Sequence, residues 1–385
     1  MRVAVIGGRL QGIEAVYLSK KAGWKVDLVD KDSDVPAAGL CDHLHTFDIM
    51  DSHKLVSLFK QVDFVIPALE NKAALSNIYK CAIEANVKFV YDPQAYMLSA
   101  SKIKSDKLFA GLGIPAPKPW PLCSFPVTVK PSGASGSENV YKVKDLQEYN
   151  KLKNSLNSFN DWVIQEFLDG PSYSIEVIGC NGKYYALQIT EIEIDDRYDC
   201  KRVLAPVELP RDMVKQFEEC AVRIAEALKL DGIMDVEAIL HDGELKVLEI
   251  DARLPSQTPT AVYKSTGINM LQLLWSGCDK EILRNSLRSE VNRGVVYEHI
   301  EVAGKQISVC GEHIIANAGH LYIYADFFGA DEAITNFREG REEWVATLII
   351  TGMDRSSAWE KRCKVIDKII EQLNIDQYID LVPEL

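Results

Sequence analysis

The sequence predicts an α/β protein that begins with a doubly wound parallel sheet of the Rossmann type. Short apolar strands alternate with helical stretches over the first hundred residues, a proline-rich run then interrupts this alternation, and a pair of acidic strands follows near residue 240. Such alternation is typical of a parallel sheet with helices on both faces. We therefore expect three domains: an N-terminal domain over 1–100, a central domain over 101–290, and an α+β C-terminal domain over 291–385.

In the N-terminal domain each predicted strand is followed by a helix. The expected strands are 3–6, 26–29, 64–66 and 89–90, and the expected helices are 12–22, 54–60 and 72–85. A further helix over 101–112 ends at Gly113-Ile114-Pro115, because glycine and proline both terminate helices. The run 115–126 reads as a linker.

The later segments mix strands and helices without a parallel repeat. After the linker we expect strands at 127–130, 162–166, 174–179 and 184–194, with helices at 145–154 and 212–228. A hairpin then turns at Asp242-Gly243, a pair typical of tight turns. The last ninety residues should contain strands at 294–302 and 344–350 and a helix at 357–373.

Composition excludes several classes of protein. The chain has 385 residues, of which 47% are hydrophobic, and a formal charge of −13, which disfavours binding to nucleic acid. It contains no apolar run of the roughly 18 to 20 residues that a membrane span needs, and it opens on a strand instead of a signal peptide. We expect a cytoplasmic protein whose nine cysteines are reduced.

The acidic hairpin is the most informative feature. Side chains alternate along a strand, so Asp235 and Glu237 share one face, as do Glu249 and Asp251 on the next strand. An antiparallel turn brings the two faces together. Hard oxygen ligands of this kind suit Mg²⁺, which binds a few carboxylates together with water and nucleotide phosphates, so the hairpin implies ATP as a substrate. The alternative is an exposed hairpin with solvated acids.

Two neighbouring features favour the metal site. Arg253 follows Asp251 by two residues, and the segment Pro-Ser-Gln-Thr-Pro-Thr after it is rigid and polar. Lys130 ends a predicted strand just before a small-residue loop that contains Ser135 and Ser137. Amides of such a loop can cradle phosphates, although a flexible hairpin tip would have the same composition.

Further residues are candidates for the nucleotide. Lys104 lies on the predicted helix 101–112, where a solvated basic face is the alternative. Glu166, Phe167, Leu168 and Asp169 follow a strand and could offer backbone groups to adenine and a carboxylate to ribose; an ordinary turn would look the same.

The loop Gly7-Gly8-Arg9-Leu10-Gln11-Gly12, with Asp30 ending the second strand, also matches a dinucleotide fingerprint weakly. A structural loop with no ligand is the alternative. A second adenine nucleotide here would use Arg9, Asp30, Asp48 and Ile49.

Taken in order, these segments resemble the ATP-grasp ligase superfamily over about residues 1–275. The resemblance implies that residues 101–290 form the ATP-grasp domain, with a lid at about 125–195, and that two Mg²⁺ are bound through Glu237, Glu249 and Asp251. It also implies that a carboxylate is activated as an acyl phosphate. Asp251 replaces the usual asparagine, and Ser172 and Tyr173 stand where the family has a glutamate, so we assign the ribose contact to Asp169.

Within the superfamily the chain most resembles the pyrrolysine-biosynthesis ligases that join 3-methylornithine to lysine. This resemblance rests on several stretches, among them Asp196-Arg197-Tyr198-Asp199-Cys200 and Glu249 to Thr260. It implies that (3R)-3-methyl-D-ornithine is activated and that the side-chain amine of L-lysine attacks. Lys130 and Arg253 would be catalytic. The expected substrate contacts are Leu10, Gln11 and Asn71 for lysine, with Asp235, Ser256, Thr258 and Glu298, and Asp199 as a further candidate carboxylate, for the other substrate groups.

Three alternatives remain at this point. Another ATP-grasp carboxylate–amine ligase or a carboxylase would share the nucleotide site but not the acceptor. A nicotinamide-dependent oxidoreductase would use the first glycine loop and form no ADP. A non-catalytic regulator would bind ATP without forming an amide, and a homodimer is possible in each case.

Overall fold

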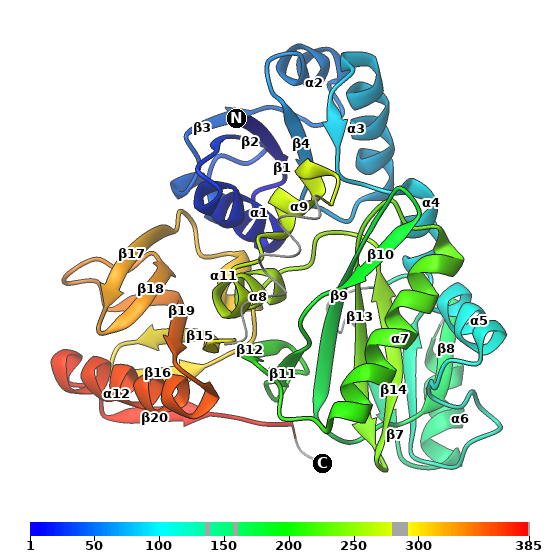
Figure 1. The fold of residues 1–385 in the computed structure, drawn as a ribbon. Helices are drawn as coiled ribbons and strands as arrows, with labels where there is room; N and C mark the ends of the chain where they lie inside the picture. Colours follow the sequence, from blue (N-terminus) through cyan, green and yellow to red (C-terminus); the bar gives the residue numbers. More distant parts are fainter. Residues whose placement is uncertain (135–138, 157–160, 279–291, 384–385) are drawn as a thin grey trace.

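The computed structural model describes residues 1–134, 139–156, 161–278 and 292–383. Within these residues it contains a five-stranded sheet, a three-stranded sheet and a twelve-stranded sheet. Figure 1 shows the five-stranded sheet at the top, the large sheet across the lower half and the three-stranded sheet at the lower right. No helix in this described part is both long and apolar enough to cross a membrane.

The N-terminal sheet is parallel and doubly wound, as the alternation predicted. Its order is β3-β2-β1-β4-β5, and every pair is parallel. The strands are β1 (Arg2–Ile6), β2 (Lys25–Asp30), β3 (His43–Thr46), β4 (Phe64–Pro67) and β5 (Lys88–Phe89). The helices are α1 (Leu10–Lys21), α2 (Ser52–Phe59), α3 (Lys72–Ala85) and the 3₁₀ turn η1 (Pro36–Gly39). Sequence analysis missed β3, because three of its four residues are polar and none of them is buried.

Two helices connect this sheet to the three-stranded sheet. They are α4 (Pro93–Ser99), and α5 (Lys102–Leu112) with Gly113 as its left-handed C-cap. The small sheet is antiparallel in the order β7-β6-β8, with β6 (Val127–Pro131), β7 (Tyr141–Val143), β8 (Trp162–Glu166) and the neighbouring helix α6 (Leu146–Ser155). Its small apolar core is completed by Trp120 of the linker, whose ring lies 4.7 Å from that of Phe125.

The large sheet runs from the acidic hairpin to the C-terminal region. Its order is β14-β13-β9-β11-β12-β15-β19-β18-β17, with β10, β16 and β20 paired at its sides. The strands of the first half are β9 (Ser172–Cys180), β10 (Lys183–Ala186), β11 (Thr190–Ile194), β12 (Cys200–Ala205), β13 (Gly232–His241) and β14 (Glu244–Asp251). Those of the second half are β15 (Gly294–Ala303), β16 (Gln306–Val309), β17 (Tyr322–Phe327), β18 (Ala330–Thr335), β19 (Glu343–Gly352) and β20 (Gln377–Asp380).

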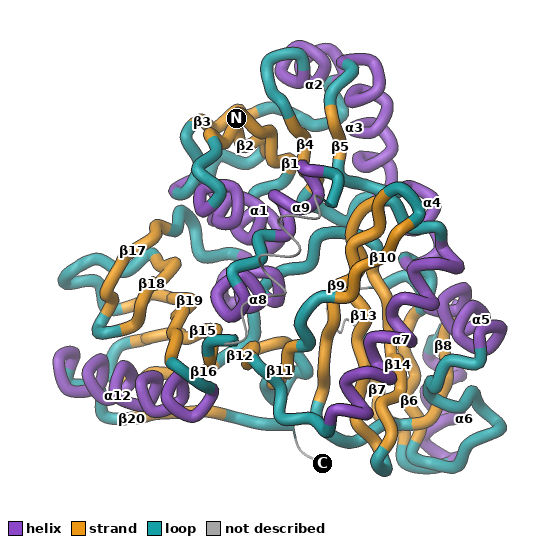
Figure 2. Tube along the Cα trace, viewed as in Figure 1, coloured by secondary structure: helices purple, strands orange, loops and turns teal. Residues whose placement is uncertain are grey.

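Helices cover this sheet and fill the centre of the molecule. Figure 2 shows α7 along β9 and β10, and α12 beneath the second half of the sheet. The helices are α7 (Arg211–Leu228), α8 (Thr258–Thr266), α9 (Met270–Ser276), α11 (His313–Ala316) and α12 (Arg355–Leu373). The sheet crosses the boundary predicted near residue 290, and that division into domains stays a prediction.

One predicted strand is wrong. Residues 184–194 form two strands, β10 and β11, and both pair with β9. Residues 187–189 lie between them, and Leu187 and Ile189 are buried there. Their apolar character disguised the break, because a run of buried residues reads as one continuous strand.

The N-terminal domain is packed tightly against the centre. Residues of β1, β2 and α1 share one apolar core with residues of α8, α9 and β15. Two buried hydrogen bonds reinforce it: the amide of Thr260 donates to the Glu14 carboxylate, and Asn269 Nδ2 donates to the Leu18 carbonyl at 2.8 Å. The joint is therefore fixed by both apolar and polar contacts.

A buried ion network ties the first half of the large sheet to its second half. Glu298 of β15 is fully buried and accepts hydrogen bonds from Arg202 of β12 and from Arg362 of α12. Arg202 also donates to Asp380 of β20 at 2.8 Å. Removing one member would leave a buried charge without its partner, which typically costs about 3–5 kcal/mol.

The cysteines differ from expectation at one pair. Cys180, at the end of β9, and Cys278, after α9, form a disulfide, although we expected reduced thiols throughout. The other seven cysteines are free. Sequence spacing could not reveal the pair, because 98 residues separate its members.

The glycines after β1 are packed so closely that Gly12 has no room for a side chain. A Cβ on Gly12 would overlap the Gly7 carbonyl, and Gly7 itself has φ of +106°. We expect Gly12→Ala to lower the melting temperature, measured by circular dichroism or calorimetry. Gly111→Ala is the matched control, since nothing lies within 4 Å of that position in α5 and alanine favours a helix by up to about 1 kcal/mol. Equal melting temperatures for the two variants would contradict the packing described.

Candidate active site

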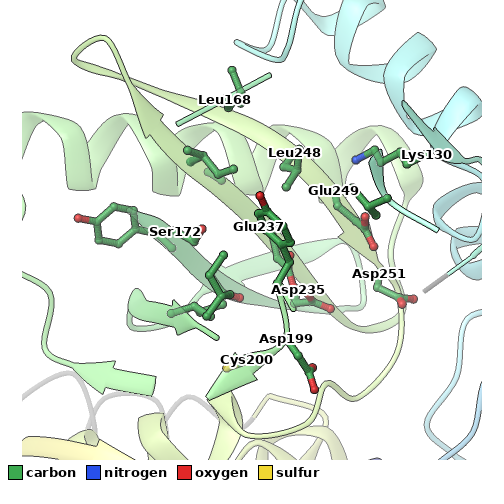
Figure 3. A pocket seen from close by; sticks show the side chains of 18 of the residues that line it. Lys130, Leu168, Ser172, Asp199, Cys200, Asp235, Glu237, Leu248, Glu249 and Asp251 are labelled. Atoms are coloured by element: carbon green, nitrogen blue, oxygen red, sulfur yellow. The ribbon is translucent and has the colours of Figure 1, made fainter. Parts of the chain in front are cut away.

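A cavity of about 520 Å³ lies between the three-stranded sheet and the acidic hairpin. Its walls come from β6, from the segment after β8, from β9, β11 and β12, and from the hairpin β13–β14. Figure 3 shows the four hairpin acids gathered along one wall with Lys130 beside them. The lining is mainly a mixture of apolar residues and ionisable groups, which suits a charged ligand with an apolar part.

The hairpin acids face one another in register. Asp235 pairs with Asp251, and Glu237 pairs with Glu249. The register shifts directly after Glu237, so Leu248 is an extra residue on β14, and both Leu248 and Glu249 line the cavity. Such a bulge re-aims side chains, as β-bulges beside active sites commonly do.

Burial makes these acids poor anions in the absence of a cation. Desolvation, followed by repulsion from Glu249, raises the pKa of Glu237 to about 7. Desolvation also raises the pKa of Asp251 to about 6, although Arg253 opposes it, and it raises the pKa of Asp235 well above its usual value. Among the described residues, Oδ1 of Asp235 and Oδ1 of Asp251 are buried and accept no hydrogen bond. Buried oxygens of this kind fit Mg²⁺.

Three cations face the acids from three different segments. Lys102 Nζ of α5 lies 3.0 Å from Glu249 Oε2. Arg253 lies 2.8 Å from Asp251 Oδ2 and 2.7 Å from Glu70 Oε1. Lys130 of β6 is 4% exposed, and burial lowers its pKa. These cations could offset the charge of a polyphosphate.

The prediction that Lys104 contacts the nucleotide is wrong. It is exposed and does not line the cavity, whereas Lys102 does. We chose the wrong face of α5, because periodicity alone does not show which side of a helix packs inward. The pair Lys102 and Asp106, four residues apart, was the missed signal: both approach Lys130 and Glu249 closely enough to perturb pKa values.

The segment after β8 forms another part of the cavity wall. Glu166, Phe167, Leu168 and Asp169 all line it. Lys246 lies 2.9 Å from Glu166 Oε2; burial opposes ionisation, but this bond and the Lys118 amide hold the pKa of Glu166 below its usual value. The amide of Asp169 donates to His241 at 3.1 Å, which anchors the segment to the hairpin.

The phosphate loop lies mostly outside the described residues, and so do Ser135 and Ser137. Its base is well defined: Lys102 donates its amide to the Ser132 carbonyl at 2.9 Å and its Nζ to the Ala134 carbonyl at 2.6 Å. The loop therefore starts directly beside the acids.

A second cavity, of about 810 Å³, lies at the carboxyl end of the N-terminal sheet. Ligands of open α/β sheets commonly bind at this edge. The structure brings together here all of the residues predicted for lysine or for a second nucleotide: Arg9, Leu10, Gln11, Asp30, Asp48, Ile49 and Asn71.

Several of these side chains already have protein partners. Gln11 Nε2 donates to Glu70 Oε1 at 3.1 Å, and the Asn71 side chain caps α3. The amides of Gly8 and Asp32 donate to the two oxygens of Asp30, and Arg9 donates to Asn317 at 2.8 Å.

The two cavities share a wall. Arg253, Ser256 and Glu312 line both of them. Asp235 and Thr258, predicted to contact substrate, line the first cavity. Asp199, which we considered for an ammonium group, lines it too.

The prediction that Glu298 contacts a substrate is also wrong. It does not line either cavity, and Arg202 and Arg362 already neutralise its buried carboxylate. The prediction rested on the need of substrate ammonium groups for a carboxylate. A carboxylate in this region fits a buried ion pair as well as a substrate site.

Sequence analysis also missed Glu70, Cys200 and Glu312. Glu70 and Cys200 follow or begin strands, and their position could have suggested them. Glu312 lies in a loop of the last ninety residues, and only the folded chain shows that it approaches the acidic hairpin.

The sequence matches a family profile described as an ATP-grasp domain over residues 99–257. A 3-methyl-D-ornithine–L-lysine ligase of Methanosarcina mazei is 35% identical over 364 residues, covering 94% of each chain. The corresponding ligase of Methanosarcina barkeri is 34% identical over 375 residues, which is 96% of this chain and 98% of that one.

Among solved structures, the fold resembles the biotin carboxylase domain of the Hydrogenobacter thermophilus 2-oxoglutarate carboxylase, which was solved with MgADP. The TM-score is 0.70, the sequences are 14% identical, and the match covers 95% of this chain and 89% of the other. This likeness concerns the fold.

We expect Lys102→Met to raise the KM for ATP roughly tenfold, equivalent to about 1.4 kcal/mol, because the amine lies between the hairpin acids and the base of the loop predicted to bind phosphates. Lys104→Met, two residues away and exposed, is the matched control and should change KM less than twofold. Steady-state assays of ADP release would measure both values. A larger effect of Lys104→Met than of Lys102→Met would show that Lys104, and not Lys102, contacts the nucleotide.

Glu237→Gln should stabilise the metal-free protein by about 1 kcal/mol or more while removing its response to Mg²⁺. The reason is that a buried, mutually repelling carboxylate is replaced by a neutral amide. Thermal unfolding with and without MgCl₂ would measure it. Asp242→Asn, at the exposed turn of the same hairpin, should leave the response unchanged. An unaltered Mg²⁺-dependent shift in Glu237→Gln would argue against its metal role.

Proposed function

The chain belongs to the ATP-grasp superfamily as an ATP- and Mg²⁺-dependent carboxylate–amine ligase that forms ADP and phosphate, and on that premise we propose its substrates. The acid is (3R)-3-methyl-D-ornithine, and the amine is the side chain of L-lysine. The amide that results would serve pyrrolysine biosynthesis. The observation that carries this proposal is similarity along nearly the whole length of two ligases that bear these substrates in their names.

The chemistry explains why ATP is needed. A carboxylate is a poor electrophile, and an amine with a pKa of about 10.4 is protonated in neutral water. Transfer of the terminal phosphoryl group to the carboxylate creates an acyl phosphate and supplies a leaving group. Attack by the amine then forms the amide and releases phosphate.

In this proposal Glu237, Glu249 and Asp251 hold Mg²⁺. When bound, Mg²⁺ would offset negative charge on the phosphates. Lys130 and Lys102 lie on the same side of the cavity and add positive charge there. Arg253 would hold the acyl phosphate and its developing oxyanion, since its guanidinium lies beside Asp251 where the two cavities meet.

The base and ribose of ATP would lie against residues 166–169. Phe167 and Leu168 supply apolar surface, and Asp169 is exposed beside them for the ribose hydroxyls. Ser135 and Ser137 stay predicted phosphate contacts of the loop after Pro131.

We assign one substrate to each cavity. Methylornithine would occupy the inner part of the first cavity, where Asp235, Ser256 and Thr258 combine a carboxylate with two hydroxyls. Lysine would occupy the second cavity, beside Leu10, Gln11 and Asn71. Ammonium groups match the acidic lining of both, and both substrates would lie beside Arg253, Ser256 and Glu312, which line the two cavities.

A second adenine nucleotide is the alternative occupant of the second cavity. Its volume of about 810 Å³ lies in the upper part of the usual range of about 300–1,000 Å³ for ligand pockets, and exceeds the needs of one amino acid. Arg9, Asp30, Asp48 and Ile49 would then make the contacts. The nicotinamide alternative is set aside, because the family is that of a ligase. A homodimer remains a proposal.

The assay combines the protein with ATP, Mg²⁺, 3-methyl-D-ornithine and lysine. We expect ADP release to depend on methylornithine, and mass spectrometry should detect an amide only when lysine is also present. Glu249→Gln should form none, because Mg²⁺ loses a ligand. Replacing methylornithine by other amino acids tests the acid, and replacing lysine tests the amine. ADP release that needs neither amino acid would contradict the proposed substrates.

A further inference from the structure

Glu312 lies where the two cavities meet. It precedes α11 in the C-terminal region and lines both cavities, in common with Arg253 and Ser256. Arg253 is committed to Asp251 and Glu70. Of the three shared residues, Glu312 is the acid, so it can offer a negative charge to a ligand in either cavity.

The Glu312 carboxylate is held in one orientation. Ser256 Oγ donates to Oε2 at 2.8 Å, and Gln257 Nε2 donates to the same atom at 2.6 Å. The Gln257 amide is itself fixed, because Cys200 Sγ donates to its Oε1 at 2.8 Å. Both donors to Glu312 use Oε2, and neither uses Oε1.

The backbone on either side of Glu312 is also fixed. The amide of Gly311 donates to Asp195 Oδ2 at 2.9 Å, and the amide of His313 donates to Asp199 Oδ2 at 2.9 Å. Both acids belong to the turn between β11 and β12. The turn thus clamps the loop, so Glu312 is positioned before any ligand binds.

Glu312 forms no ion pair with a lysine or arginine in the part of the chain that the structure describes, whereas Lys102 and Arg253 each pair with an acid. The charge of Arg253 favours the ionised form of Glu312 from a longer distance, but it is already paired with Asp251 and Glu70. A half-buried carboxylate that is held by neutral donors beside two cavities favours a cation from a ligand. An ammonium group has the matching charge and donors.

We propose that Glu312 binds the ammonium group of the attacking amine substrate and positions its nitrogen for the acyl phosphate. This inference rests on the proposed function. It assigns to the C-terminal region a direct part in the second half-reaction. Glu312 then acts on the amine, and Arg253 and the hairpin acids act on the nucleotide and the acid.

Amide formation replaces the bond from the acyl carbon to phosphate by a bond to nitrogen. The nitrogen forms a bond to the acyl carbon, the bond from that carbon to the phosphate oxygen breaks, and phosphate leaves with the electron pair. An ammonium group loses two protons in becoming an amide. One passes to the Glu312 carboxylate and then to water, and the other leaves with phosphate. Burial raises the pKa of Glu312, which helps it accept a proton.

The test separates the two half-reactions with Glu312→Gln. Glutamine keeps an oxygen that can accept from Ser256 and Gln257, so the loop should stay in place. Hydroxylamine, which is largely uncharged at neutral pH, replaces lysine and traps the acyl phosphate as a hydroxamate. We expect hydroxamate formation within about twofold of the unaltered enzyme, and at least a tenfold fall in kcat/KM for lysine. Glu312→Asp should recover part of that loss.

Glu339→Gln is the matched control, since it removes an exposed acid of the same region. Equal loss of hydroxamate and amide would place Glu312 in the activation of the acid and overturn the proposal. Unchanged kcat/KM for lysine would overturn it as well. If the unaltered enzyme forms no hydroxamate from methylornithine, the proposed acid substrate fails, and the role of Glu312 is then tested with the acid that does support trapping.

Discussion

The structure depends on an arrangement that is unfavourable by itself: four carboxylates crowd one face of a largely buried hairpin. Two unit charges about 4 Å apart repel by roughly 4 kcal/mol at an effective dielectric constant of about 20, so several such pairs exceed the gain from a few hydrogen bonds. Asp235 and Asp251, paired across the strands, each keep one oxygen without a hydrogen bond among the described residues. On the proposed assignment, Mg²⁺ and a nucleotide complete the site and offset this cost.

Cations of neighbouring segments offset part of the repulsion between these carboxylates. Lys102, Lys130 and Arg253 come from a helix, a strand and the segment after the hairpin, and each brings positive charge to the acids. The same charge that makes the hairpin tolerable can bind phosphates. The same three cations therefore reduce the repulsion between the carboxylates and, on the proposed assignment, would bind the phosphates of ATP.

Sequence analysis located what local patterns encode. The alternation of strands and helices predicted the parallel sheet, and period-two spacing of acids around Asp242-Gly243 predicted the hairpin wall. It failed where tertiary packing decides. Lys104 and Lys102 differ only in which face of α5 turns inward, and Glu298 became an ion-pair partner only when β12, β15 and α12 came together. Glu312 approaches the site through contacts between distant segments, which no local pattern records.

The joint between the N-terminal domain and α8 has a consequence for selectivity. Glu14 and Leu18 of α1 accept hydrogen bonds from Thr260 and Asn269, and these bonds hold the second cavity against the segment that carries Ser256 and Gln257. On the proposed assignment, the gap that the lysine side chain must bridge is set by the scaffold. The protein would then select for the length of the amine side chain. A shorter or longer side chain would place its nitrogen away from the reacting carbon, and displacements of about 1 Å can reduce rates a hundredfold.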